Sequence, residues 1–87
     1  MKIKKGFVVR SIAGESVVVA LGAASKNFNG IIKLNETGRF LWDILAEGAN
    51  EEELLARMTE EYEVSSEIAQ ADIEKFITSL RGAGIIE

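Results

Sequence analysis

Residues 28–45 read FNGIIKLNETGRFLWDIL, and this stretch decides the fold because it passes from a strand directly into a helix. The residues from Ile31 to Leu34 are mostly β-branched or apolar, a composition typical of strands, and Lys33 is the only charge among them. Asn35 is a favourable N-cap, and Glu36 suits the positive end of the helix that begins there. We therefore predict a short strand at 31–34 that is joined without a loop to a helix.

The segment upstream predicts two more strands. Phe7 to Ile12 and Val17 to Leu21 are rich in β-branched residues, and the residues between them, Ala13 to Ser16, are typical of a turn. These strands form a hairpin, and the 31–34 strand completes a small antiparallel meander. A sheet of this size needs a layer of helices to be stable.

Three helices are predicted downstream. The first ends near Ala46, Asn50 begins the second with a capping-box pattern, and Ser65 or Ser66 caps a third that runs to about Arg81. The order of elements predicts a single α+β domain over residues 1–87, with the helices on one face of a three-stranded antiparallel sheet.

Two residues of the first helix carry further expectations. Trp42 is predicted to pack near the core while partly exposed. Gly38 lies in the first turn, where glycine is about 1 kcal/mol less favourable than alanine. We therefore expect another backbone to approach Gly38 closely.

The third helix carries two stripes of side chains. One stripe is apolar and must face the core; it comprises Ala69, Ile73, Phe76, Ile77 and Leu80. The adjoining stripe mixes an apolar residue, both signs of charge and a hydroxyl, at Ile68, Asp72, Lys75 and Ser79. This second stripe is either a solvated shoulder of the helix or one wall of a groove whose other wall is the 31–34 strand.

The 31–34 strand, if it lies at the edge of the sheet, has few of the features that usually prevent an edge strand from pairing with another chain. Edge strands usually carry proline, charges or bulges, because their unpaired N–H and C=O groups can pair with another chain. This chain has no proline. An extended peptide could add to the edge as a further strand, or one of the protein's own loops or a second copy could cover it. If Ile32 faces the open edge, a proline there should reduce peptide binding more than stability.

Composition excludes several classes of site. The chain has neither cysteine nor histidine, which rules out the common zinc sites, cysteine nucleophiles and histidine acid–base chemistry. No glycine-rich phosphate loop occurs. We therefore expect a protein that is not an enzyme and that holds no cofactor or metal. The sequence has no apolar run long enough to span a membrane and no signal peptide. Because it also lacks cysteine, a cytoplasmic location is the default expectation.

Charge is divided unevenly along the chain. Residues 1–34 carry six basic residues and one acidic residue, whereas residues 35–87 carry four basic and thirteen acidic residues. The acidic part either solvates the helices or repels nucleic acid, and the basic part suits an acidic partner. We expect Lys33 and the amino-terminal lysines to speed the encounter with an acidic peptide.

The segment from Lys26 to Glu87 resembles the family of PqqD-like proteins, named for pyrroloquinoline-quinone biosynthesis protein D. The most specific parts are LNETGRFLWDIL at 34–45, the acidic second helix after it and LRGAGIIE at 80–87. The resemblance implies a winged-helix-like fold that acts as a RiPP recognition element. Such a domain captures the leader segment of a ribosomally made, post-translationally modified peptide (RiPP).

The resemblance also implies a site and partners. The leader would add to the third strand and lie between it and the third helix. The implied peptide-binding residues are Asn29, Gly30, Ile31, Ile32, Lys33, Leu34, Ile68, Asp72, Lys75, Phe76 and Ser79. The implied partners are the precursor peptide and a peptide-modifying enzyme, often a radical S-adenosylmethionine enzyme, and pyrroloquinoline quinone is the product in only some of the relatives.

Two other functions are compatible with the same pattern. The second and third helices, joined by a short turn, could mimic a DNA-binding helix-turn-helix. Both helices are acidic, however, where phosphate binding needs clustered lysine and arginine. The other alternative is a homodimer formed through the open strand edge.

Overall fold

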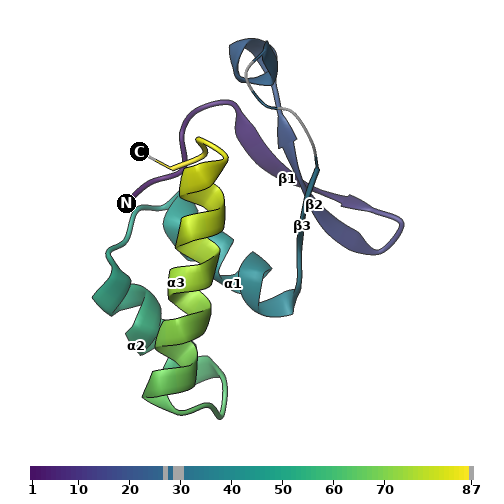
Figure 1. The fold of residues 1–87 in the computed structure, drawn as a ribbon. Coiled ribbons are helices and arrows are strands. Elements are labelled where there is room, and N and C mark those ends of the chain that lie inside the picture. Colours follow the sequence, from purple (N-terminus) through teal and green to yellow (C-terminus); the bar gives the residue numbers. More distant parts are fainter. Residues whose placement is uncertain (27, 29–30, 87) are drawn as a thin grey trace.

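The computed structural model describes residues 1–26, 28 and 31–86 and contains a three-stranded antiparallel sheet followed by three helices. The elements in chain order are β1 (Phe7–Ile12), β2 (Glu15–Ala20), the short 3-10 helix η1 (Gly22–Lys26), β3 (Ile32–Leu34), α1 (Glu36–Ala46), α2 (Glu51–Glu61) and α3 (Ser66–Gly82). Figure 1 shows the three helices packed together to one side of the sheet. The predicted α+β architecture is therefore confirmed.

The sheet has the order β1–β2–β3, so β3 is an edge strand. The turn between β1 and β2 consists of only Ala13 and Gly14, whose φ angles are 53° and 82°. Positive φ at both positions matches the two-residue turns that suit the twist of a hairpin. The turn is thus shorter than the predicted one, and β2 begins at Glu15 rather than at Val17.

The pairing of β3 with β2 is brief. Its register joins Ser16 to Leu34, Val17 to Lys33 and Val18 to Ile32. Ile31, which we included in the predicted strand, lies just before β3.

Each helix begins at a polar cap. The Asn35 side-chain oxygen accepts a hydrogen bond from the Gly38 N–H at 2.8 Å. Asn50 takes part in a complete capping box, and the Ser65 hydroxyl accepts a hydrogen bond from the Ile68 N–H. These bonds satisfy N–H groups that the first turn of a helix leaves unpaired. The cap at Asn35 fixes the start of α1 directly after β3.

The core lies between the helices and the inner face of the sheet. Trp42 is only 4% exposed, so the prediction that it is partly exposed is wrong. Trp42 belongs to the main hydrophobic cluster, and the helix that carries it contacts both β3 and α2. The other buried members of the cluster are Val18, Leu41, Ile44, Leu45, Ala49, Leu54, Met58, Ala69, Ile73, Ile77, Leu80, Ile85 and Ile86.

A residue larger than glycine at position 38 would be crowded by two neighbouring side chains. A Cβ atom there would be 3.1 Å from the Asn35 side-chain oxygen and 3.6 Å from the side chain of Leu34. The expected approach of another backbone is therefore incorrect. The crowding follows from the direct junction, which places the cap and the last residue of β3 over the first turn of α1.

The first and last parts of the described chain are paired with each other. Ile3 and Ile86 form an antiparallel bridge, and the Lys4 N–H donates to the Ile85 carbonyl at 2.8 Å. Both Ile85 and Ile86 are buried. This terminal clasp, formed by residues 3–4 and 85–86, connects the segment that leads into β1 with the segment that follows α3, and Figure 1 shows the two ends close together.

Candidate functional site

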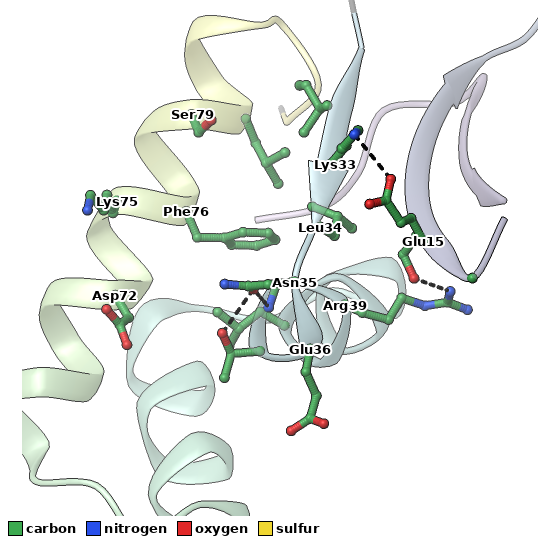
Figure 2. A pocket seen from close by; sticks show the side chains of 17 residues that line it. Glu15, Lys33, Leu34, Asn35, Glu36, Arg39, Asp72, Lys75, Phe76 and Ser79 are labelled. Carbon is green, nitrogen blue, oxygen red and sulfur yellow. Dashed lines mark hydrogen bonds and ion pairs between the residues drawn. The ribbon is translucent and has the colours of Figure 1, made fainter. Parts of the chain in front are cut away.

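A groove of about 1040 Å³ lies between β3 and α3. Figure 2 shows the side chains of Leu34 and Phe76 turned toward each other across it. The apolar residues that line it are Ile32, Leu34, Leu41, Phe76 and Leu80. Its charged residues balance, because Glu15, Glu36 and Asp72 are matched by Lys33, Arg39 and Lys75. The groove thus offers an apolar floor with a charged rim.

The hydrogen-bonding phase of β2 determines which backbone groups of β3 lie at the open edge. In an antiparallel ladder, one residue directs both its N–H and its C=O to one neighbour, and the next residue directs them to the other. The Leu21 N–H donates to the Gly6 carbonyl of the segment before β1, at 2.6 Å. Val17 is in phase with Leu21, so its backbone groups also point toward β1.

The intervening residues of β2 therefore bond to β3. Val18 and Ser16 are paired with Ile32 and Leu34, which consequently direct their backbone groups toward β2. Lys33 lies between them and directs its N–H and C=O away from β2, toward the open edge.

This edge has no strand partner within the described part of the chain. An edge strand with unpaired N–H and C=O groups is a template for another extended chain. The proline prediction for Ile32 required that its backbone face the open edge, and this condition is not met, because its N–H faces β2. The position that meets the condition is Lys33.

The side chains of β3 divide between two environments. Ile32 and Leu34 pack against the core, so Lys33, which alternates with them, lies on the outer face of the sheet. The Lys33 ammonium is 3.1 Å from the Glu15 carboxylate, and the two side chains are 66% and 57% exposed. Figure 2 shows this ion pair on the side of β3 away from Phe76. Such an exposed pair contributes at most about 1 kcal/mol, so it can rearrange readily.

The opposite wall of the groove comes from one face of α3. Asp72, Lys75, Phe76 and Ser79 line the groove, and their spacing of three or four residues places them on one side of the helix. Phe76 is half-buried and reaches the floor, while the other three are exposed along the rim.

The structure brings together most of the predicted site residues. Residues 32–34 of β3 and the four residues of α3 line the same groove. Ile31 is 74% exposed and Ile68 is 57% exposed, and both lie outside the lining. Asn29 and Gly30 fall outside the described residues. That any of these residues binds a peptide stays a prediction.

Two segments of the lining were missed by sequence reasoning. They are the hairpin end at Gly14–Ser16 and the first turn of α1 at Glu36–Arg39. The cap signal at Asn35 could have indicated the second, because a helix that begins directly after an edge strand must border the same space. The hairpin end carries no comparable sequence signal, because its position beside the groove depends on the length of the turn between β1 and β2.

The amino-terminal lysines are not part of the groove. Lys2 lines a separate hollow together with Gly48 and Asn50. Any effect of Lys2 on a guest in the groove would therefore act through long-range attraction, which salt screens.

The described residues show neither a metal site nor a membrane span. Within residues 1–26, 28 and 31–86, no three acidic side chains gather as a possible metal site. Across these residues, no helix combines the length and the apolar character needed to cross a membrane.

The single tyrosine of the chain offers a pH-dependent signal close to the groove. Tyr62 packs edge-to-face on Phe40, with ring centroids 5.4 Å apart. Partial burial raises the pKa of Tyr62 above its ordinary value of 10.0, and the negative charges of Glu36 and Glu61 raise it further. Because Glu36 also lines the groove, Tyr62 reports on the charge at that rim.

We expect the native protein to form phenolate at higher pH than the urea-unfolded protein. The unfolded chain then loses its tyrosine proton first, so the free energy of unfolding should fall as pH rises from about 10 through the native pKa. Ultraviolet absorbance titration measures both midpoints, and Glu36→Gln should lower the native one. Coincident midpoints for native and unfolded protein would contradict the assigned environment.

This chain matches one protein family and shares its fold with solved structures. The chain matches the family described as coenzyme PQQ synthesis protein D (PqqD) over residues 14–86. It is similar to a solved structure of TbiB1 in complex with the TbiA(beta) leader peptide, with a TM-score of 0.78 and 26% identity over 100% of this chain and 95% of that chain.

A second solved structure shares the fold. It is a lasso peptide synthetase B1 complexed with the leader peptide, with a TM-score of 0.74 and 23% identity over 97% of this chain and 93% of that chain. Comparison with curated protein sequences found no match.

Proposed function

Since this chain belongs to the PqqD family, we propose that it binds the leader segment of a ribosomally made precursor peptide by strand addition. The leader pairs with the open edge of β3 and occupies the groove beside α3. The observation that carries this proposal is the edge of β3, which pairs with no strand among the described residues and borders an apolar groove. TbiB1, which is 26% identical, is described in complex with a leader peptide, and this supports the same use of the fold here.

The two walls have different tasks in this proposal. The backbone of Lys33 supplies hydrogen bonds that any extended peptide can make. Leu34 and Phe76 supply apolar contacts that select among peptides, because their side chains line the floor. Ile31, Ile68, Asn29 and Gly30 are further residues that we propose contact the leader.

The proposal includes a partner and a location. Binding the leader leaves the remainder of the precursor available to a maturation enzyme, and a radical S-adenosylmethionine enzyme is the class we propose. Both proteins act in the cytoplasm, and this chain contributes binding rather than catalysis. Membership of the PqqD family supports this assignment.

DNA binding has weaker support from the charges of the helices. In α2, five glutamates stand against Arg57 alone. In α3, three acidic residues stand against Lys75 and Arg81. Phosphate contacts require clustered positive charge, which neither helix presents.

An mRNA-displayed library of random 15-residue peptides provides a test that does not require the sequence of the precursor. We expect the protein to select peptides with dissociation constants in the micromolar range, about 8 kcal/mol of binding free energy. NMR titration of the ¹⁵N-labelled protein should place the shift changes on Lys33 and on the groove face of α3. Failure to enrich any binder, or shift changes confined to other surfaces, would overturn the proposal.

A further inference from the structure

We infer that the side chain of Lys33 selects the guest by charge, and that the favoured leader carries an acidic residue directly opposite Lys33. This inference rests on the proposed function. It adds a specificity that the balanced charge of the groove lining does not itself provide.

The geometry of the edge places one guest residue next to the Lys33 side chain. Lys33 directs its N–H and C=O to the open edge, so an antiparallel guest forms a hydrogen-bonded pair centred on it. Side chains of directly opposed residues lie on the same face of a sheet, with Cβ atoms roughly 5 Å apart. The guest residue opposite Lys33 therefore lies on the outer face of the sheet, away from Phe76 and the apolar floor.

The row of side chains that the guest would extend is basic. Arg10 on β1 is paired with Val17 on β2, and Val17 is paired with Lys33 on β3. Glu15 is the only acidic residue among residues 1–34. Its carboxylate contacts Lys33 from the β2 side at 3.1 Å. An ammonium group has three donors, so Lys33 can keep Glu15 and still bond an acidic guest residue on its other side.

The same charge disfavours the other occupant of this edge, a second copy of the chain. The antiparallel register that pairs all three residues of one β3 with all three of another sets Lys33 opposite Lys33. Like charges directly opposed are destabilising, and an edge lysine is one of the devices that limits edge-to-edge association. Lys33 thus opposes self-pairing and favours a guest of opposite charge.

The test uses one peptide from the displayed library and three versions of it. Cross-strand NOEs identify the peptide residue opposite Lys33, and that residue is made Glu, Gln or Lys. The wild-type protein should bind the Glu version about three- to tenfold more tightly than the Lys version, the range that cross-strand charge pairs allow. Isothermal titration calorimetry at fixed salt measures the three affinities.

A charge-swapped protein provides the matched control. The double variant Glu15→Lys with Lys33→Glu keeps an ion pair between the same two positions while reversing the sign at the edge. It should prefer the Lys version of the peptide, and Lys33→Gln should bind the Glu and Lys versions about equally. A wild-type protein with no preference, or a Lys33→Gln protein that keeps the preference, would overturn the inference.

The two proposals fail in different ways. Peptides that bind at β3 without charge preference overturn the role of the Lys33 side chain and leave strand addition intact. A library that yields no peptide at β3 overturns strand addition and, with it, the inference about Lys33.

Discussion

A Lys33→Pro variant should lose most of its peptide binding and still fold. Proline removes the Lys33 N–H and sets its ring at the edge where the guest would pair. That N–H takes no part in the β2–β3 ladder, so the variant should lose less than about 1 kcal/mol of stability, as expected for proline on an edge strand. Affinity for library-selected peptides should fall at least tenfold, since a lost backbone hydrogen bond alone contributes about 1 kcal/mol and the ring adds a steric clash.

Two further variants isolate the cause. Lys33→Ala keeps the N–H and should retain most of the binding of a peptide with a neutral residue opposite, which separates the backbone from the side chain. Ile32→Pro should instead destabilise the protein by about 1–3 kcal/mol, because its N–H faces β2 and its loss leaves a carbonyl of β2 unpaired. Calorimetry and urea unfolding give the two quantities. If Lys33→Pro binds like the wild type, or if Ile32→Pro is as stable as Lys33→Pro, the assignment of the edge is incorrect.

A Trp42→Ala variant should be severely destabilised. The side chain is 4% exposed and belongs to the main cluster, and removing a buried aromatic side chain costs about 3–5 kcal/mol. Small domains have about 5–15 kcal/mol of stability in total, so the variant should be partly unfolded at moderate temperature. Urea unfolding followed by circular dichroism measures the change, since the substitution removes the only tryptophan.

An exposed apolar residue provides the comparison for Trp42. Ile12 is 54% exposed at the end of β1, and Ile12→Ala should alter stability by no more than about 0.5 kcal/mol. A loss below about 1 kcal/mol for Trp42→Ala would mean that the indole is partly exposed, as the sequence had predicted.

The elements of the fold could be predicted because their signals are local. The caps at Asn35, Asn50 and Ser65 each consist of one side chain and a nearby N–H. The first two were placed correctly, and the third was one of the two residues predicted. The burial of Trp42 could not be predicted, because it depends on which elements pack around α1, and these include both β3 and α2. A helical wheel shows which face is apolar and does not show how many elements surround the helix.

The two walls of the site could be predicted from the sequence. The residue of β3 that directs its N–H and C=O to the open edge could not. The mixed stripe of α3 and the weakly guarded strand left a groove as one of two interpretations, and residues of both line a groove in the structure. The residue whose backbone faces the edge depends on the turn at Ala13–Gly14, because that turn sets the hydrogen-bonding phase of the whole ladder. A shift of one residue in that turn would exchange the roles of Ile32 and Lys33.

The terminal clasp has a consequence for the entropy of recognition. It ties the lead-in to β1 to the residues after α3, and thereby holds the sheet and the last helix at a set separation. Because α3 also forms one wall of the groove, we expect the clasp to limit how far α3 can move from the sheet before a guest binds. We therefore expect the ordering of the guest to be a large part of the cost of association, so that peptides already extended in solution bind more tightly.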